Sequence, residues 1–195
     1  MQSLIDHART FHALAAERGV ELDRLAAGQS PQALFITCSD SRVIPSLFTG
    51  ARPGELFELR TAGNIIPRHL PDRSSGEAAT IEYAVEVLRV SDIVVCGHSH
   101  CGAVGALVRG EDLGAVPAVR EWLRNADAPP AADHGPDVAR AVQAHVLAQL
   151  ERLREYPAVA ARLAEGRVSL RGWFYEVHTG SVLAHRPGTD DFLPL

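Results

Sequence analysis

The stretch ALFITCSDSR at residues 33–42 decides the fold, because an apolar, β-prone run changes there abruptly into a polar turn. The stretch IVVCGHSHCG at residues 93–102 repeats the pattern 60 residues later. Short apolar runs that end in Gly-, Ser- or Asp-rich turns are typical of buried parallel strands. The carboxyl ends of such strands lie at one edge of a sheet, where α/β proteins bind their ligands. The pattern therefore predicts an α/β fold whose functional residues come from these two turns.

The remaining sequence predicts a mostly parallel central sheet of four to five strands, flanked by helices, with an antiparallel strand at its C-terminal edge. Further strands are expected over residues 55–59 and 168–175, and a turn leads from the latter into a hairpin strand at 182–184. The longest helix is expected over residues 137–156. Its predicted apolar stripe contains Val138, Val142, His145, Val146, Gln149 and Leu153.

A single domain over residues 1–195 follows from length and composition. The chain is 46% hydrophobic and no linker or shift of composition divides it. It carries a net charge of −5, and all 19 of its basic residues are arginine. No basic cluster stands out, so nucleic acid and anionic membranes are poor partners. Arginine-only usage with abundant alanine is typical of a GC-rich bacterial genome.

The two polar turns together offer three ligands for one zinc ion. Cys38 ends the first apolar run, and His98 and Cys101 follow the second at a spacing that lets both face one point. Two thiolates at about 2.3 Å and one imidazole at about 2.0–2.1 Å, with a fourth position left to water, make a catalytic zinc site. Cys96, inside its predicted strand, is expected to be a small core residue. Three cysteines without a secretory signal indicate a reducing cytoplasm rather than disulfides.

Asp40 and Arg42 leave two arrangements open. Asp40 either binds the metal as a fourth ligand and closes the site, or turns away to pair with Arg42 and leaves the site open to water. Arg42 is suited to the second arrangement, because a guanidinium can hold a carboxylate with two parallel hydrogen bonds. An ordinary surface ion pair is the third possibility, and such pairs contribute little.

These motifs resemble the β-class carbonic anhydrases. The resemblance rests on Cys38-x-Asp40-x-Arg42, on His98-x-x-Cys101, and on the phrases PGE (53–55), AGN (62–64), IEYAV (81–85) and GW (172–173), and it covers about residues 25 to 185. It implies one Zn²⁺ per subunit held by Cys38, His98 and Cys101, with Asp40 as an exchangeable fourth ligand. It also implies that Asp40 and Arg42 form the catalytic dyad.

The reaction implied by this resemblance is the reversible hydration of CO₂ to bicarbonate and a proton, by attack of a zinc-bound hydroxide. A CS₂ or COS hydrolase could use the same scaffold and ligands. A non-catalytic zinc-binding regulatory protein is a further alternative. The Asp40–Arg42 pair argues against it, since a purely structural site gains nothing from an arginine that removes its fourth ligand. No single histidine among the nine stands out as a proton shuttle.

The plant-type branch of the family is indicated by the residues expected around the substrate. Its pocket glutamine, phenylalanine and tyrosine would fall on Gln29, Phe57 and Tyr83, and Gly102 is expected to line the same pocket. A tight apolar slot with one or two donors suits CO₂, although Phe57 and Tyr83 could also be core aromatics. The plant-type resemblance implies an open site at neutral pH. One departure is Thr61, where many relatives carry asparagine.

The N-terminal segment bears on assembly and location. Residues 1–25 are expected to form an amphipathic helix that packs on a partner subunit, because relatives in this family are dimers or multiples of dimers. The polar residues of this segment exclude a signal peptide or a membrane span. A cytoplasmic homo-oligomer is therefore expected. Its apolar positions are Leu4, Ile5, Ala8, Phe11 and Leu14.

Overall fold

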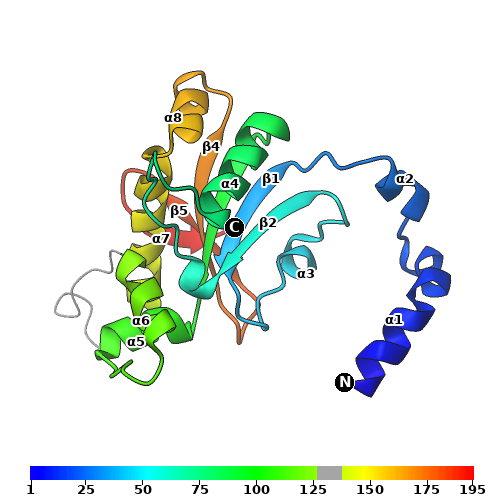
Figure 1. The fold of residues 1–195 in the computed structure, drawn as a ribbon, viewed down its shortest axis with the longest axis horizontal. Coiled ribbons are helices and arrows are strands. Elements are labelled where there is room, and N and C mark those ends of the chain that lie inside the picture. The colour runs from blue at the N-terminus through cyan, green and yellow to red at the C-terminus, as the bar shows by residue number, and fades with distance from the viewer. Residues whose placement is uncertain (127–137) are drawn as a thin grey trace.

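The computed structural model describes residues 1–126 and 138–195, and its centre is a six-stranded sheet in the order β2-β1-β3-β4-β5-β6 (Figure 1). The first four strands are parallel, and β5 and β6 are antiparallel to their neighbours. The predicted α/β class and the mostly parallel sheet are confirmed. The strands are β1 (Ala33–Cys38), β2 (Leu56–Thr61), β3 (Asp92–His98), β4 (Ser169–Tyr175), β5 (Val182–Arg186) and β6 (Asp191–Pro194).

The sixth strand exceeds the four to five that were predicted. β6 has only 4 residues, is mostly exposed and contains a proline, so its sequence carries no strand pattern of its own. It forms because the turn after β5 brings it back beside that strand, where Arg186 pairs with Asp191.

Helices precede β1 and occupy the connections between the parallel strands. They are α1 (Gln2–Leu14), α2 (Leu22–Ala26), α3 (Pro45–Thr49), α4 (Gly76–Glu82), α5 (Gly102–Arg109), α6 (Pro117–Leu123), α7 (Val138–Arg154) and α8 (Pro157–Ala164), with the short 3₁₀ turns η1 (Ala16–Arg18), η2 (Ala62–Asn64) and η4 (Arg124–Ala126) and the π-helical segment η3 (Tyr83–Val87). The long helix predicted over 137–156 is α7, although residue 137 lies outside the described ranges. Pro157 begins α8 as its first residue, a position where proline costs no hydrogen bond.

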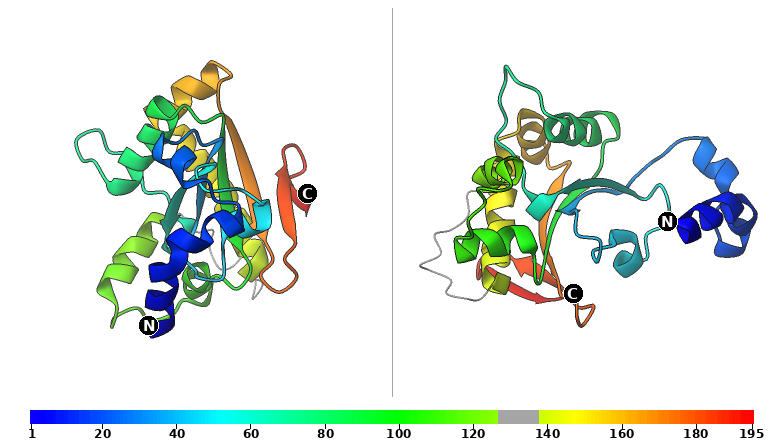
Figure 2. Two further views of the ribbon diagram at one scale, coloured as in Figure 1. Left: turned by 90° about the vertical axis from the view of Figure 1, so that its right-hand side faces the viewer. Right: turned by 60° about the horizontal axis from the view of Figure 1, so that its bottom comes forward.

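The main core lies between the sheet and helices α4, α7 and α8. Leu34 and Ile36 of β1 face these helices, and Phe35 between them faces the opposite side of the sheet, as alternation along a strand requires. On that opposite side α3 covers only part of the sheet (Figure 2). The central strands β1 and β3 are nevertheless buried on both faces, and their carboxyl ends lie side by side.

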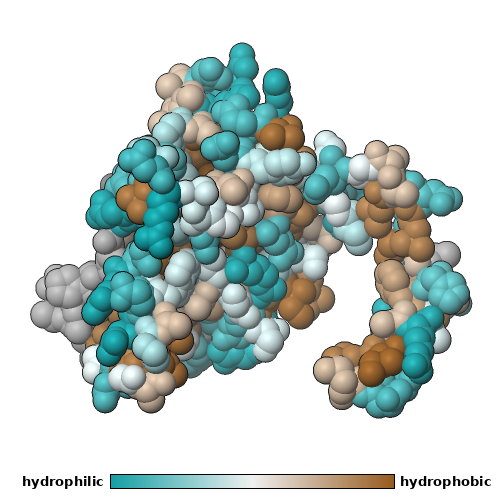
Figure 3. Space-filling view, in the orientation of Figure 1, coloured by the Kyte–Doolittle hydropathy of each residue, from teal (hydrophilic) through white to brown (hydrophobic). Residues whose placement is uncertain are grey.

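Helices α1 and α2 form an arm that projects from the body of the molecule (Figures 1 and 2). α1 has no buried residue, and Leu4 is 68% exposed on it. Hydrophobic residues lie along this arm in the space-filling view (Figure 3). No helix within residues 1–126 and 138–195 has an apolar run that could cross a membrane.

Candidate metal centre

Three potential metal ligands meet at the carboxyl edge of the sheet. Cys38 is the last residue of β1, His98 is the last residue of β3, and Cys101 caps the N-terminus of α5. The ligand atoms of these three side chains lie within 4.8 Å of one another, and all three residues are buried. The structure thus brings together the three residues that the sequence pattern singled out, because β1 and β3 are parallel neighbours.

His98 is oriented as a metal ligand. Its Nδ1 lies 2.9 Å from the carbonyl oxygen of Ser99, and because a carbonyl only accepts, Nδ1 carries the proton. The lone pair therefore sits on Nε2, which is buried and has no hydrogen-bond partner in the described part of the chain. A buried polar atom without a partner costs free energy. A metal cation held by this nitrogen and the two sulfurs would remove that cost, so the residues fit a zinc ion.

The two cysteine thiols also favour a bound cation, because only one of them ionises readily without it. A hydrogen bond from Cys101, together with the Gly63 amide, lowers the pKa of Cys38 despite its burial. The neighbouring Cys38 thiolate and burial raise the pKa of Cys101. The two sulfurs thus share one negative charge when no cation is near. A divalent cation is the group that allows both thiolates to form.

Asp40 lies at the edge of this cluster and is turned toward Arg42. Arg42 donates from Nε to Oδ1 at 2.9 Å, from Nη2 to Oδ2 at 2.7 Å, and from its backbone N–H to Oδ1 at 3.0 Å. Its Nη2 also donates to the carbonyl of His100 at 3.1 Å. Hydrogen bonding to Arg42 holds the pKa of the Asp40 carboxyl well below its usual range. Asp40 Oδ2 is still 3.9 Å from His98 Nε2, so the carboxylate borders the metal centre.

Arg60 is a site residue that the sequence analysis did not assign. Its Nη2 donates to the carbonyls of Cys38, Asp40 and Val43 at 2.7–2.9 Å, so one guanidinium holds the whole turn that carries the first ligand and the carboxylate. An arginine at an exposed position of a strand gives no sign of this role. Only the pairing of β1 with β2 brings it to the turn.

The residues expected around the substrate are not all brought together within one chain. Gly102 begins α5 directly after Cys101, beside the cluster. In the register of β1 against β2, Phe57 lies opposite Leu34 and Thr61 lies opposite Cys38. Phe57 is therefore four residues along the strand from the level of Cys38. At 3.3 Å per residue, Phe57 is displaced by about 13 Å along the sheet from the level of Cys38. Tyr83 lies beside Phe57, with ring centroids 5.9 Å apart.

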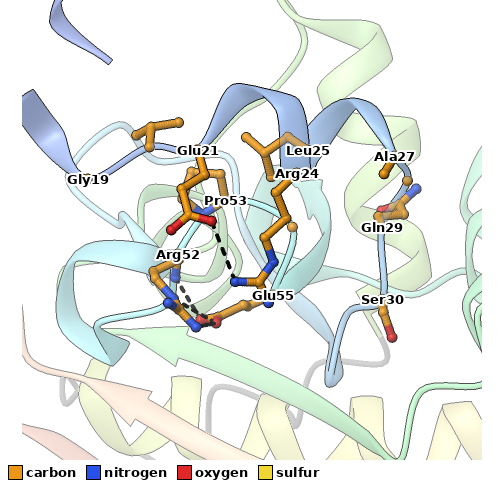
Figure 4. Close-up of a pocket in the computed structure, with 13 residues that line it drawn as sticks. Gly19, Glu21, Arg24, Leu25, Ala27, Gln29, Ser30, Arg52, Pro53 and Glu55 are labelled. Atoms are coloured by element: carbon orange, nitrogen blue, oxygen red, sulfur yellow. Dashed lines mark hydrogen bonds and ion pairs between the residues drawn. The ribbon is translucent and has the colours of Figure 1, made fainter. Parts of the chain in front are cut away.

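Gln29 lies in a different place again. It lines a cavity of about 360 Å³ between α2 and the turn before β2 (Figure 4). None of the ligand residues borders this cavity. Its charged residues pair with one another, Arg52 with Glu55 at 2.7 Å and Arg24 with Glu21 at 4.0 Å.

A model of the carbonic anhydrase family matches residues 33–182, which include the three ligand residues and the Asp40–Arg42 pair. The chain belongs to the β-class carbonic anhydrases. It is 46% identical over 190 residues to a carbonic anhydrase of Pseudomonas aeruginosa, covering 93% of this chain and 86% of that protein. The family that the sequence motifs indicated is confirmed.

Solved structures support the same assignment. The β-carbonic anhydrase CcaA superimposes with a TM-score of 0.90 at 39% identity, covering 100% of this chain and 99% of that one. Tetrameric β-carbonic anhydrases of Sordaria macrospora match with a TM-score of 0.77 at 29% identity, over 94% of each chain. The protein is therefore an enzyme that interconverts CO₂ and bicarbonate, with the Cys-His-Cys site typical of its class.

Proposed function

We propose that each subunit binds one Zn²⁺ through Cys38, His98 and Cys101, and that Asp40 and Arg42 form the catalytic dyad of CO₂ hydration. The observation that carries this proposal is the buried, unpartnered Nε2 of His98 between two sulfurs, with Asp40 turned away to Arg42. Zinc, when bound, supplies a Lewis acid that lowers the pKa of water to about 7. A zinc ion held by these three protein ligands would keep a position for that water.

Asp40 has one lone pair left to orient a water molecule at the site. A carboxylate offers about four lone-pair positions. Oδ1 accepts two hydrogen bonds from Arg42 and Oδ2 accepts one, so Oδ2 keeps an unused lone pair on the atom nearest to His98. Because Arg42 lowers the pKa of Asp40, the carboxylate stays ionised at neutral pH and accepts a hydrogen bond without taking the proton. Asp40 thus orients the nucleophile, and Arg42 keeps Asp40 off the metal.

We place the substrate pocket between two subunits and assign the enzyme to the plant-type branch. Gln29, Phe57, Tyr83 and Gly102 are proposed to line this pocket. Phe57 lies about 13 Å along the sheet from Cys38 of its own chain, so a pocket that holds both needs Phe57 from a second copy. Tyr83 beside it is 44% exposed and available to a partner. The plant-type assignment implies an open site at neutral pH.

The arm of α1 and α2 supports this assembly. α1 buries nothing within its own chain, and Leu4, Ile5 and Phe11 are all exposed on it. We propose that residues 1–195 form a single domain, from which residues 1–25 extend to pack on a partner in a homodimer or a multiple of dimers. The tetrameric relatives from Sordaria macrospora are consistent with such assembly. The two ligand thiols must stay reduced, which fits a cytoplasmic location.

Stopped-flow CO₂ hydration with a pH indicator, combined with zinc analysis, tests the dyad. Asp40→Ala and Arg42→Ala are expected to lower turnover by about tenfold or more while zinc is retained, because the three other ligands remain. Arg109→Ala is the matched control, since Arg109 also pairs with a carboxylate two residues away, Glu111 at 2.7 Å, but in the exposed turn after α5. Full activity in either dyad variant would contradict the assignment.

The pH dependence tests the open site. An open site is active at neutral as well as alkaline pH. Activity confined to pH values above about 8 would mean that Asp40 occupies the metal at neutral pH, and it would refute the plant-type assignment.

A further inference from the structure

The turn η2 (Ala62–Asn64) lies against the metal centre in a left-handed conformation. Gly63 has φ 72° and ψ 20°, and Asn64 follows it with φ 48°. The backbone N–H of Gly63 donates to Cys38 Sγ at 3.3 Å. A residue other than glycine with positive φ is unfavourable and persists only when its surroundings hold it. The Asn64 side chain does not do so, because neither of its polar atoms has a hydrogen-bond partner in the described part of the chain.

Side chains from two helices hold this turn by its carbonyl groups. Trp122 of α6 donates from Nε1 to the carbonyl of Ala62 at 2.9 Å. His145 of α7 lies with Nε2 2.8 Å from the carbonyl of Gly63. One helical turn further along α7, Gln149 Oε1 accepts from the N–H of Ile66 at 2.7 Å. The turn is thus held from outside at two successive carbonyls, and the chain that follows it is held at Ile66.

The contact of Trp122 acts on the same peptide group that binds the sulfur. The carbonyl of Ala62 and the N–H of Gly63 belong to one peptide unit. The Trp122 indole therefore donates to one end of this unit while its other end donates to Cys38. Hydrogen bonds in such a chain polarise one another, which strengthens the N–H···S contact.

His145 fixes the next peptide unit. Since the Gly63 carbonyl only accepts, His145 Nε2 carries the proton, and its buried Nδ1 has no partner among the described residues. Burial lowers the pKa of His145 and keeps the ring neutral. A fully buried imidazole with an unpartnered ring nitrogen among the described residues is costly at a core position, where an apolar residue would pack without that cost.

We propose that Trp122 and His145 are positioning residues for the Cys38 thiolate: by holding the carbonyls of Ala62 and Gly63, they aim the Gly63 N–H at the sulfur. This inference rests on the proposed function, since it matters only if Cys38 binds the metal. The N–H···S bond withdraws electron density from the thiolate, so the metal stays a stronger Lewis acid and the sulfur is harder to protonate. Glycine is required at position 63, because a Cβ would lie 3.0 Å from that of Ala103 at a positive φ.

The absorption spectrum of the Co²⁺-substituted enzyme tests this proposal, because the thiolate-to-cobalt charge-transfer band reports the sulfur directly. Trp122→Phe and His145→Ala are both expected to shift the band to longer wavelength and to weaken metal retention against a chelator by about tenfold or more. Trp122→Phe keeps an aromatic ring at a partly exposed position, so it remains decisive if His145→Ala does not fold.

Matched controls are Trp173→Phe and His69→Ala. Trp173 packs on Phe35 on the other face of the sheet, and His69 packs on Tyr156. Neither variant should move the band. An unchanged band and unchanged metal retention in Trp122→Phe would overturn the inference. Absence of any thiolate charge-transfer band in the unmodified Co²⁺ enzyme would instead overturn the proposed ligand set, so the two failures are distinguishable.

Discussion

Replacing Gly97 with alanine tests how closely α7 packs against the strand that carries His98. A Cβ at position 97 would lie 2.5 Å from Val142 Cγ1 and 2.8 Å from Val146 Cγ2. Carbon atoms in van der Waals contact are about 3.5–4.0 Å apart, so the helix or the valine side chains must move by about 1 Å. Both valines are fully buried, which leaves them no free space for this movement.

The expected cost follows from this overlap. Overpacking of a core by one methyl group destabilises by about 1–3 kcal/mol. In a domain of this length each kcal/mol lowers the melting temperature by about 2–4 °C. Val142→Ala removes the closest clashing atom, although alone it leaves a small cavity. The two substitutions are therefore expected to be non-additive, with a favourable coupling of about 0.5–3 kcal/mol in the double variant.

Urea unfolding of the four proteins measures this coupling. All are compared at one protein concentration, because assembly makes apparent stability depend on concentration. If Gly97→Ala is as stable as the unmodified enzyme to within about 0.5 kcal/mol, or if the two effects simply add, the packing argument is wrong.

Three further predictions concern buried titratable groups and thiols. Burial lowers the pKa of His145, so below about pH 6.5 the unfolded chain binds a proton that the folded chain does not. The free energy of unfolding in urea should then fall as the pH falls from about 6.5 through the folded pKa, and less steeply in His145→Gln. After chelation of the metal, a thiol-specific disulfide reagent should modify Cys38 first, because neighbouring hydrogen bonds lower the pKa of its thiol. Cys96, fully buried and with its pKa raised to about 12 by burial, should react only on unfolding, as mass spectrometry of the labelled peptides can show. Tyr156→Phe should lower the free energy of thermal unfolding by about 1 kcal/mol, because the hydroxyl donates to a main-chain carbonyl at 2.8 Å.

The ligand cluster could be predicted from the sequence because its geometry follows from strand ends. β1 and β3 are apolar on both faces, so their continuous apolar runs are visible without alignment. Where each run stops, the chain reaches the carboxyl edge of the sheet, and Cys38 and His98 sit at those last positions. Because β1 and β3 are adjacent and parallel, the two turns that follow them lie together, whatever lies between them in sequence.

The supports of the cluster could not be predicted in this way. Periodicity placed His145 on the apolar stripe of α7, and the structure confirms that this position is buried. No pattern within α7 says that its Nε2 would reach the Gly63 carbonyl, 82 residues away. Arg60 is a similar case, because its three carbonyl partners are collected only when the turn after β1 folds back beside β2. Contacts of this kind depend on how elements dock, which side-chain periodicity does not encode.

The residues proposed to line the substrate pocket differ from the metal ligands in what the sequence can say about them. Matching Phe57 and Tyr83 to a pocket position says nothing about which copy of the chain supplies them. The register of β2 against β1 places Phe57 toward the amino end of the sheet, while the ligands lie at the carboxyl end. A pocket that serves the metal centre must adjoin it, so we expect another subunit to bring its Phe57 to this site. The exposed arm and the exposed ring of Tyr83 then have one common explanation: both are surfaces that a second copy is expected to cover.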